Sequence, residues 1–440
     1  MLSTLPARSL HGSRKVSYPD TVKYLYSLGN ELKPGAKFSL EPMRKLLSGL
    51  GNPESGQRFI HVAGTNGKGS TCATISSILR EAGFRAGLYT SPHLIEPTER
   101  IEIDGRAITR AQFATAFETV HAAAEQLLAT EELAIHPSYF ETVTAMALLL
   151  FRESCNIAVL EVGLGGRLDA TNIVTPDLCV ITPVAYDHEA FLGNTLESIA
   201  SEKAGILKPR VPVLLSPQLA AAEAVIAARA CDLGCEVIRT ADHPISDIRS
   251  SPGGSEFRLS GRTYRCVLPG RHQIDNARTA ILASRRLNVP EHSIQAGLDT
   301  VVWPGRLEFV AHNPDFVLDG AHNPAAAAAL ASYIREFCGD RPVWLVYGAM
   351  RDKAIDEVTE QLFPLATHLI LTAPNFSRAL RPEAILEIDG HPNVHITPTI
   401  AEAIEMAHTA PPNAIVFFTG SLFLVGEARA LLVKRSESVS

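Results

Sequence analysis

The sequence predicts an α/β protein with two domains, each built on a mostly parallel sheet. Short apolar runs alternate with helical patterns from residue 59 to about residue 215, and the same alternation restarts after residue 300. A glycine-rich loop with one lysine joins the first apolar run to a long helical pattern. The chain has 440 residues, enough for two or three domains. We expect a larger domain with the phosphate-loop (P-loop) plan over residues 1–299 and a smaller Rossmann-like domain over residues 300–440.

The elements of the larger domain follow from the spacing of apolar residues and from the glycines and prolines between them. Two short helices, at 21–28 and 40–50, precede the first strand, and residues 236–268 are richer in strands and turns. Strands of the parallel sheet are expected at residues 59–63, 86–89, 157–162, 178–182 and 211–215. Helices are expected at residues 70–82, 110–129, 139–152, 195–207 and 271–287.

The smaller domain follows Trp303-Pro304-Gly305, a turn sequence that we interpret as a hinge or linker. Asn323 and Pro324 are typical of a helix N-cap and of the first helical position, so a helix is expected at 324–337. Strands are expected at residues 316–319, 343–348, 368–372, 394–396 and 414–419.

The composition excludes several classes of protein. The formal net charge is −7 and no basic tract is present, so nucleic acid is not an expected partner. The longest clean apolar run, residues 145–151, is far too short to span a bilayer. Arg8, Arg14 and Lys15 are followed by no apolar core, which argues against a secretory signal. The seven cysteines include no C-x-x-C pair, so we expect reduced thiols in a cytoplasmic protein.

The loop after the first strand predicts a phosphate-binding site. It reads Gly64-Thr-Asn-Gly-Lys-Gly-Ser70, in which glycines let backbone N–H groups surround an anion and Lys68 adds a full charge. The match to G-x-x-x-x-G-K-[ST] is imperfect, because Gly69 follows the lysine and the hydroxyl comes one residue later. An ordinary strand-to-helix turn is the alternative. Because a strand and a helix flank the loop, we favour binding of a nucleoside triphosphate.

Two polar residues follow strands at the edge where open α/β sheets place their ligands. Glu161 closes an apolar strand, and an acid there requires an ion pair or a bound cation. We favour a magnesium ligand over a salt bridge to Arg167. His188 follows the next strand in the pair Asp187-His188. Residue chemistry alone favours a loop histidine bonded to backbone over a metal ligand at this position.

Lys203 lies on the apolar stripe of the helix expected at 195–207, seven residues after Leu196. A lysine that points inward has a lowered pKa, and its neutral amine can react with carbon dioxide to form a carbamate, an anion that can bind metal. The residues alone favour a snorkelling lysine, or a lysine paired with an acid such as Asp187.

Polar residues also gather at the start of the smaller domain. Asp319 ends a strand, and His322 and Asn323 follow it. Asn323 suits helix capping, whereas Asp319 can bond ribose hydroxyls. Arg306, just after the linker, can reach a phosphate when the domains close and stabilise the charge of a transferring phosphoryl group.

Taken together, these segments resemble the folylpolyglutamate synthase and dihydrofolate synthase family of the Mur ligase superfamily. The resemblance extends from about residue 18 to residue 430, and its motifs are long and in the expected order. They are Gly64 to Ser70, Thr90-Ser-Pro-His-Leu94, Glu161 to Asn172, Asp187-His188, Ser201-Glu-Lys-Ala-Gly-Ile206, Gly305-Arg306, Asp319-Gly-Ala-His-Asn-Pro324 and Phe418-Thr-Gly-Ser-Leu422.

The resemblance implies an ATP-dependent, magnesium-dependent amide ligase of folate metabolism. In this family the γ-phosphate of ATP moves to a substrate carboxylate, and the amine of L-glutamate then displaces phosphate from the acyl phosphate. Phosphorylation turns a poor leaving group into a good one, and magnesium and basic groups screen the two anions that must meet. The implied acceptors are dihydropteroate, reduced folates or both, and a monomer is the default state of the family.

The resemblance also implies a role for each matching residue. The catalytic residues would be Lys68, His188, Lys203 and Arg306. The nucleotide site would comprise Thr65, Asn66, Gly67, Lys68, Gly69, Ser70, Asn276, Arg306, Asp319 and His322. Two magnesium sites would use Ser91, Glu161, His188 and Lys203, the last as a carbamate. The pterin site would comprise Ser138, Tyr139, Phe140, Glu141, Leu168, Asp169 and Ala170, although helix core is the alternative for Tyr139 and Phe140.

Two departures from the family pattern concern peripheral positions. The chain reads Ala185-Tyr186-Asp187-His188 where the family often reads Gly-Leu-Asp-His, and Asp352-Lys353-Ala354 lacks a second aspartate. Other hypotheses remain: a Mur-type ligase of a peptidoglycan precursor, a single-activity folylpolyglutamate synthase, and a nucleotide-binding regulator without catalysis. A GTP-dependent switch is disfavoured, because the string Asn-Lys-x-Asp is absent.

Overall fold

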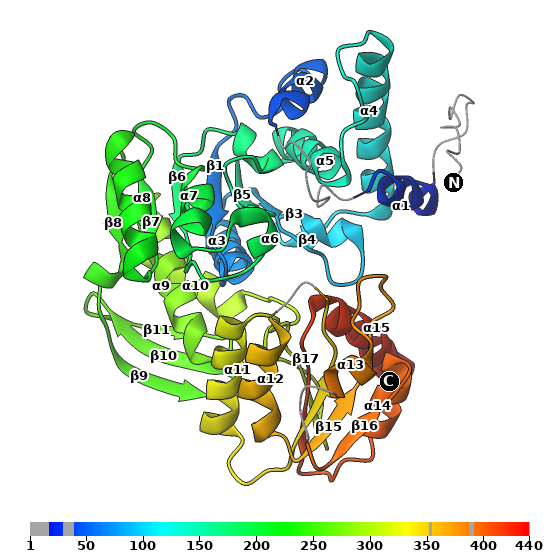
Figure 1. Ribbon diagram of the computed structural model, residues 1–440. Coiled ribbons are helices and arrows are strands. Elements are labelled where there is room, and N and C mark those ends of the chain that lie inside the picture. The colour runs from blue at the N-terminus through cyan, green and yellow to red at the C-terminus, as the bar shows by residue number, and fades with distance from the viewer. Residues whose placement is uncertain (1–16, 30–38, 352–353, 387–390, 440) are drawn as a thin grey trace.

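The structure is a computed structural model that describes residues 17–29, 39–351, 354–386 and 391–439. Figure 1 shows two bodies, one above the other, each built on its own large sheet, and a small three-stranded sheet at the lower left. Asp352 and Lys353, where the sequence departs from the family pattern, lie outside the described residues. Two parallel sheets with helices on both faces confirm the predicted α/β class.

The first sheet has eight strands in the order β4-β3-β2-β5-β1-β6-β7-β8. Six of them are parallel, whereas β3 and β4 form an antiparallel hairpin at one edge. The central strand β1 is buried on both faces, which explains its continuous apolar run. The strand bounds are β1 Phe59–Ala63, β2 Ala86–Tyr89, β3 Ile101–Ile103, β4 Arg106–Ala107, β5 Ile157–Glu161, β6 Leu178–Ile181, β7 Val213–Leu215 and β8 Val237–Arg239.

Helices cover both faces of the first sheet, and their apolar sides build its core. One face carries α1 (Tyr18–Ser27), α2 (Glu41–Gly49), α4 (Arg110–Ala129), α5 (Tyr139–Ser154), α7 (Leu196–Ala204) and α8 (Ala220–Asp232). The opposite face carries α3 (Lys68–Glu81), α9 (Arg271–Arg286) and α10 (Glu291–Thr300). A short helix, α6 (Glu189–Leu192), follows β6, and 3-10 turns lie at Pro97–Arg100, Ala170–Ile173, Thr240–Asp242 and Phe363–Leu365.

A three-stranded antiparallel sheet accounts for the strand-rich segment predicted at 236–268. Its strands are β9 (Ile245–Ser251), β10 (Gly254–Leu259) and β11 (Arg262–Cys266). The apolar side chains of Phe257 and Tyr264 belong to the same core cluster as α3, α9 and α10. This small sheet therefore covers helices of the first body rather than forming a separate core.

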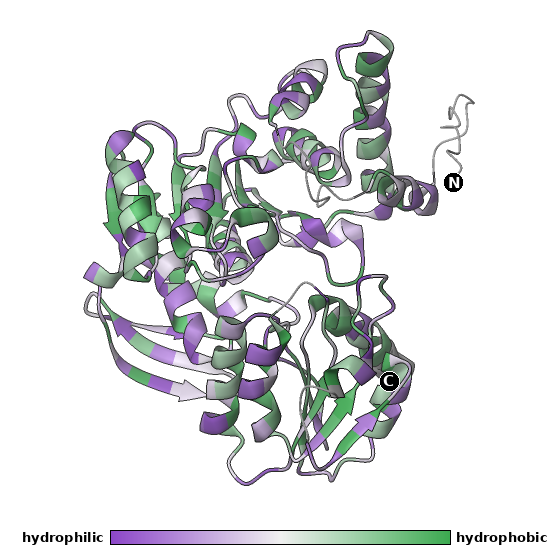
Figure 2. Cartoon of the chain, viewed as in Figure 1, coloured by the Kyte–Doolittle hydropathy of each residue, from purple (hydrophilic) through white to green (hydrophobic). Residues whose placement is uncertain are grey.

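The second body is a six-stranded sheet in the order β12-β13-β17-β14-β15-β16, parallel except for the edge strand β12. Helices α11 and α12 pack on one face, and α14 and α15 pack on the other. Figure 2 shows hydrophobic strands at its centre. The strands are β12 Glu308–Ala311, β13 Asp315–Leu318, β14 Val343–Tyr347, β15 His368–Leu371, β16 Val394–Ile396 and β17 Ile415–Thr419. The helices are α11 Pro324–Phe337, α12 Ile355–Leu362, α13 Pro382–Leu386, α14 Ile400–Ala407 and α15 Leu422–Val439.

Most predicted elements are present, and those that the sequence patterns missed are mainly short or at edges. The hairpin β3–β4, the strands β8 and β12, and the helix α6 each have two to four residues, too few for a periodic signal. The longer helices α8 and α10 were also missed. Helix α3 begins at Lys68, two residues before the predicted start at Ser70.

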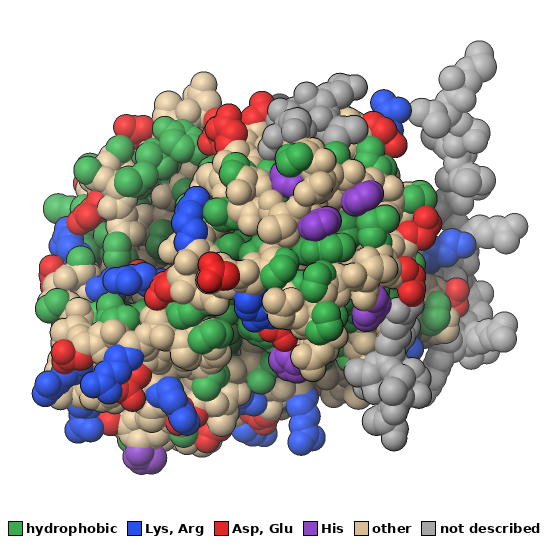
Figure 3. All heavy atoms as spheres, turned by 90° about the horizontal axis from the view of Figure 1, so that it is seen from below, with side chains coloured by type: hydrophobic (Ala, Val, Ile, Leu, Met, Phe, Trp, Pro, Cys, Tyr) green, Lys and Arg blue, Asp and Glu red, His purple; other side chains and the backbone are tan. Residues whose placement is uncertain are grey.

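Three further features concern the helices, the cysteines and the surface of the molecule. In the described part of the chain, no helix combines the length and the apolar character needed to cross a lipid bilayer. All seven cysteines are free thiols. On the face seen in Figure 3, basic, acidic and hydrophobic side chains all reach the surface.

Candidate active site

The carboxyl ends of the first parallel sheet open into a cavity of about 540 Å³, at the edge where open α/β sheets bind ligands. Both bodies line it. The first contributes the loops after β1, β5 and β6, and the second contributes Arg306, which precedes β12, and the residues between β13 and α11. Of the predicted site residues, the cavity is lined by Thr65, Asn66, Gly67, Lys68, Gly69, Ser70, Ser91, Tyr139, Phe140, Glu161, Asp169, His188, Lys203, Asn276, Arg306, Asp319 and His322.

The phosphate loop, residues 64–70, is tied to the loop after β6. The N–H groups of Thr65 and Asn66 donate to the Pro183 carbonyl at 2.9 and 3.2 Å. Lys68 opens helix α3, and its Nζ donates to the Thr65 carbonyl at 3.2 Å. The first N–H groups of an α-helix have no partner within the helix and carry its positive dipole end. The loop thus presents backbone donors and an ammonium group to the cavity, as an anion site requires.

Two features require glycine at position 67: its left-handed backbone conformation and the close approach of Asn276. The φ of Gly67 is 82°, and a Cβ at this position would lie 2.3 Å from Asn276 Oδ1. Asn276 is itself held in place, because its Nδ2 donates to Gln273 Oε1 at 2.9 Å. The close approach brings helix α9 against the phosphate loop.

We expect Gly67→Ala to destabilise the protein more than Gly83→Ala. Gly83 has nearly the same φ, 84°, but nothing lies within 4 Å of a Cβ placed there. Both variants incur the backbone strain, whereas only Gly67→Ala also displaces Asn276, at about 1–3 kcal/mol. Urea unfolding measures the difference, and equal losses would show that Asn276 moves aside at no energetic expense.

Gly69 explains the departure from the usual phosphate-loop pattern. A Cβ at position 69 would lie 2.6 Å from Trp303 Cζ2, so the indole of the linker occupies the space of a side chain there. The hydroxyl that usually follows the lysine is supplied instead by Ser70, whose Oγ accepts from Gln273 Nε2 at 3.2 Å.

Glu161 is the last residue of β5, and its buried carboxylate reaches the cavity. The N–H of Ser91 donates to Glu161 Oε2 at 3.2 Å. Burial raises the pKa of this carboxyl, and the charge of Lys68 opposes the shift most strongly. Arg167 bonds Glu202 at 2.9 Å instead. The alternative of a salt bridge between Glu161 and Arg167 is therefore wrong.

His188 lies in the left-handed region, with φ of 53°, at the start of α6. Its backbone N–H donates to Asp187 Oδ1 at 2.9 Å, and its Nε2 is 3.9 Å from the same oxygen. Asp187 also lines the cavity, where its Oδ2 accepts from Asn323 Nδ2 at 3.3 Å. Asp187 enters the sequence interpretation through the Asp187-His188 motif and as an ion-pair partner for Lys203, and its place in the cavity lining is not predicted there.

Lys203 is buried, with 5% of its surface exposed, and points from α7 into the site. Its Nζ donates to the Gly64 carbonyl at 2.8 Å, at the start of the phosphate loop. Burial, together with the nearby charge of Lys68, lowers the pKa of this amine to about 7, while the charge of Asp187 opposes the shift. A snorkelling lysine is therefore excluded, and a large share of the amine is neutral near pH 7.

The second body reaches the cavity through Arg306, Asp319 and the start of α11. Asp319 is buried, and its oxygens accept from the N–H groups of Leu307 and Ala321, each at 3.0 Å. The carboxylate therefore shapes the linker, while burial raises its pKa and Arg306 opposes that shift. His322 Nε2 lies 3.8 Å from Asp187 Oδ2.

Asn323 caps α11 as predicted and also joins the two bodies. Its Oδ1 accepts from the Ala326 N–H at 2.9 Å, which is the N-cap bond. Its Nδ2 donates to Asn66 Oδ1 at 3.0 Å, in the phosphate loop. One side chain thus both starts a helix and crosses the domain boundary.

The seven residues predicted to contact the pterin fall into two groups, those that line the cavity and those that do not. Ser138 and Glu141 form a capping box, since Ser138 Oγ accepts from the Glu141 N–H at 3.3 Å and Glu141 Oε2 accepts from the Ser138 N–H at 2.8 Å. These two residues, together with Leu168 and Ala170, are not among the residues that line the cavity. The capping bonds explain the pattern at Ser138 and Glu141, and a substrate role for these four residues stays a prediction.

Tyr139, Phe140 and Asp169 do line the cavity. The ring of Tyr139 stacks on Tyr26 with centroids 5.6 Å apart. Asp169 Oδ2 accepts from the N–H groups of Gly163 and Leu164, both at 2.9 Å, and so holds the glycine-rich turn after β5. Tyr139 belongs to the helix core and to the cavity wall at once, so the two interpretations of this residue are compatible.

The cavity residues without an assigned role in the sequence interpretation include Arg100, His272 and Gln273. The guanidinium of Arg100 lies 5.2 Å from the centroid of the Tyr139 ring. Burial lowers the pKa of His272 to about 4, and the charge of Arg306 contributes. His272 and Gln273 lie in the same short segment as Asn276, so that segment could have indicated them. Arg100 directly precedes β3, and no local sequence pattern marks it as a cavity residue.

Comparisons with known proteins agree with this architecture. The Mur ligase middle domain family matches residues 62–284, and the glutamate ligase domain of Mur ligases matches residues 305–422. The chain is 34% identical over 431 residues to the dihydrofolate synthase/folylpolyglutamate synthase of Bacillus subtilis, covering 94% of this chain and 99% of that protein. It is 37% identical over 433 residues to a probable bifunctional folylpolyglutamate synthase/dihydropteroate synthase of Haloferax volcanii, but this 94% of the chain spans only 50% of that relative.

A solved structure extends the likeness to three dimensions. The folylpolyglutamate synthase of Mycobacterium tuberculosis complexed with ADP superposes with a TM-score of 0.88 at 30% identity, covering 94% of this chain and 98% of that one. Fold and cavity thus define a two-domain ligase of the Mur type. Within that class, the chain belongs to the folylpolyglutamate synthase and dihydrofolate synthase family.

Proposed function

We propose that this protein is an ATP-dependent ligase that joins L-glutamate to dihydropteroate, to reduced folates, or to both, through an acyl phosphate. The observation that carries the proposal is one cavity in which a phosphate loop, a buried carboxylate, a buried lysine and an arginine of the second body converge. Relatives that match nearly end to end are named for these two activities, and a structural relative binds ADP.

The nucleotide phosphates would lie on residues 64–70, where backbone N–H groups and Lys68 face the cavity. Asn276 would contact the nucleotide from α9, and Arg306, Asp319 and His322 would approach it from the second body. The acceptor would enter beside Tyr139 and Phe140, whose rings offer an apolar wall to a flat heterocycle. Its carboxylate would then meet the γ-phosphate near Lys68.

The residues present fit divalent magnesium. Glu161 provides a buried carboxylate, and Arg167 does not neutralise it, because Arg167 pairs with Glu202. The hydroxyl of Ser91 and the imidazole of His188 line the same cavity. We propose that these three residues hold one ion and that Lys203, as a carbamate, supports a second. When bound, magnesium would neutralise phosphate charge and polarise the transferring group.

Arg306 is proposed to stabilise the charge of the transferring phosphoryl group. We expect Arg306→Met to lower kcat by about 10³-fold or more, as for arginines that act on phosphoryl transfer, with a smaller change in the KM for ATP. Arg335→Met is a matched control, because that exposed residue of α11 lies outside the cavity lining. Steady-state kinetics separate the two parameters, and an unchanged kcat would remove Arg306 from the mechanism.

The decisive experiment is ADP release by the purified protein with MgATP and L-glutamate, comparing dihydropteroate with tetrahydrofolate. Stimulation by both acceptors establishes a bifunctional synthase, and stimulation by one establishes a single activity. No stimulation by either, with stimulation by a peptidoglycan precursor, would contradict the proposal in favour of another Mur-type ligase. We further propose that the protein is a monomer, which sedimentation tests, and that it is cytoplasmic, which fractionation tests. The free cysteines support the cytoplasmic assignment.

A further inference from the structure

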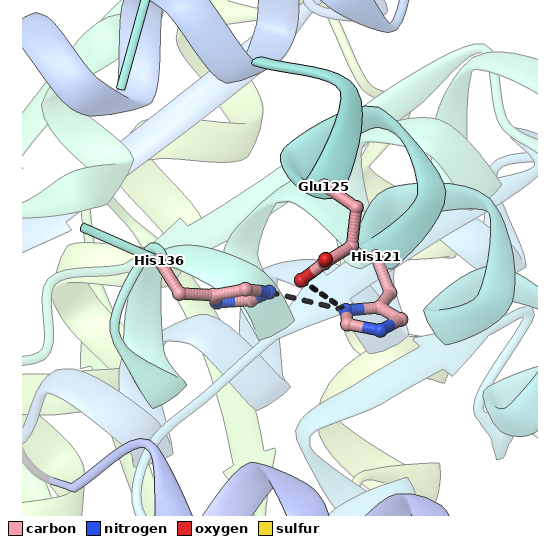
Figure 4. Close-up of side chains that lie close together, drawn as sticks. All are labelled: His121, Glu125 and His136. Atoms are coloured by element: carbon pink, nitrogen blue, oxygen red, sulfur yellow. Dashed lines mark hydrogen bonds and ion pairs between the residues drawn. The ribbon is translucent and has the colours of Figure 1, made fainter. Parts of the chain in front are cut away.

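A second cluster of metal-ligand side chains lies outside the cavity, between α4 and the start of α5. His121 and Glu125 are one turn apart on α4, and His136 comes from the segment that leads into α5. One donor atom from each of these three residues lies within 4.8 Å of the other two. Figure 4 shows the two imidazoles and the carboxylate turned toward one another. We propose that these three side chains bind a borderline divalent metal ion such as Zn²⁺.

The nitrogen geometry carries the proposal. His121 Nδ1 lies 3.1 Å from His136 Nε2 (Figure 4). Two imidazole nitrogens that bind one tetrahedral zinc, each at roughly 2.0–2.1 Å, are roughly 3.3 Å apart. Glu125 Oε1 lies 3.9 Å from His121 Nδ1, a separation that a change of side-chain rotamer on the exposed end of Glu125 closes. Small movements therefore convert this cluster into a three-ligand site.

The tautomer of His136 favours metal binding. Its Nδ1 lies 2.9 Å from the carbonyl oxygen of Pro137. Because a carbonyl oxygen only accepts, this nitrogen carries the proton, and the lone pair of Nε2 points at the cluster. A second ring nitrogen bonded to a backbone carbonyl is the usual support of a metal-binding histidine.

Aromatic rings hold the imidazole of His121 in place. Phe117 stacks on it with centroids 5.2 Å apart and an interplanar angle of 8°. Tyr24 of α1 meets it edge-on at 4.9 Å and also lies 5.8 Å from His136. The rings limit the freedom of both ligands before any metal arrives, which lowers the entropic barrier to binding.

Two histidines and one carboxylate favour zinc, cobalt or nickel over magnesium, which prefers oxygen ligands. None of the three residues lines the cavity. The site would therefore be structural, linking α4 to the segment 130–138 that positions Tyr139 at the cavity wall. The proposal does not depend on the ligase activity.

Isothermal titration of the untagged protein with ZnCl₂, in excess MgCl₂, tests the proposal. We expect the wild type to bind one equivalent more than His121→Asn and His136→Asn, or to bind it about 100-fold more tightly. His292→Asn is the matched control, since this exposed histidine lies on α10, away from the cluster. Circular dichroism verifies that each variant is folded. Equal zinc binding by the wild type and by both cluster variants would reduce the cluster to a hydrogen-bonded histidine pair.

Cobalt gives a second readout that identifies the ligands. Co²⁺ in a tetrahedral site with nitrogen ligands absorbs in the visible range, and we expect this absorption in the wild type and in His292→Asn. It should be lost in His136→Asn, because this substitution removes one ligand at a partly buried position outside the helices and strands. A spectrum typical of octahedral Co²⁺ in the wild type would overturn the assignment.

Discussion

Lys68→Ala is expected to abolish ADP formation, with a loss of about 10³-fold or more, because its ammonium is the full positive charge of the phosphate loop. The position is fixed by the structure: Lys68 is the first residue of α3, and its Nζ is held 3.2 Å from the Thr65 carbonyl at the cavity. A coupled assay of ADP release measures the loss. Activity near that of the wild type would contradict the assignment of residues 64–70 to phosphate binding.

Lys45→Ala is a matched control for this variant. Lys45 also donates to one backbone carbonyl, that of Glu132, at 2.9 Å. It lies on α2, outside the cavity lining, so its removal deletes a comparable bond without removing charge from the site. We expect Lys45→Ala to retain ADP formation. A loss in both variants would indicate a general effect of lysine removal on the fold.

The sequence predicts the phosphate loop and the ends of the strands well because these features are local. A glycine-rich turn between an apolar run and a helix contains its own signal, and Glu161 and Asp319 mark strand ends by their positions. The conformation that Gly67 requires and the N-cap at Asn323 are likewise local properties. Such features depend on a few neighbouring residues, so pattern reasoning recovers them.

Contacts between distant segments are what the residues alone could not predict. The bond from Asn323 to Asn66 joins positions 257 residues apart, and no local pattern relates them. Arg100 reaches the cavity only because β3, which follows it in the chain, pairs with β2. Ser138 and Glu141 illustrate the reverse case, since a local capping bond explains a pattern that family resemblance assigned to substrate.

Lys203 shows how tertiary structure resolves an ambiguity in the sequence. An amine on an apolar stripe is compatible with snorkelling, ion pairing or reaction, and only burial distinguishes them. The helix α7 places Nζ inside the site, where desolvation lowers its pKa to about 7. Above that pH the amine is mostly neutral and can attack carbon dioxide, forming an N–C bond and releasing a proton. Below it the ammonium cannot react, so a carbamate should be lost as the pH falls through 7.

We therefore expect Lys203→Ala to be inactive and to be partly rescued by short carboxylic acids such as acetate, which replace the carboxylate of a carbamate. Lys203→Arg should be inactive without rescue, because its permanent cation fills the same space. Labelling with ¹³C-bicarbonate should give a carbamate signal in the wild type and in Lys208→Arg, a matched control at a lysine that bonds Asn172. The signal should be absent in Lys203→Arg. Rescue of Lys203→Ala by acetate, together with the ¹³C signal in the wild type, would identify the carbamate as the active form. Unchanged turnover in Lys203→Ala would instead limit the role of Lys203 to its hydrogen bond with the Gly64 carbonyl.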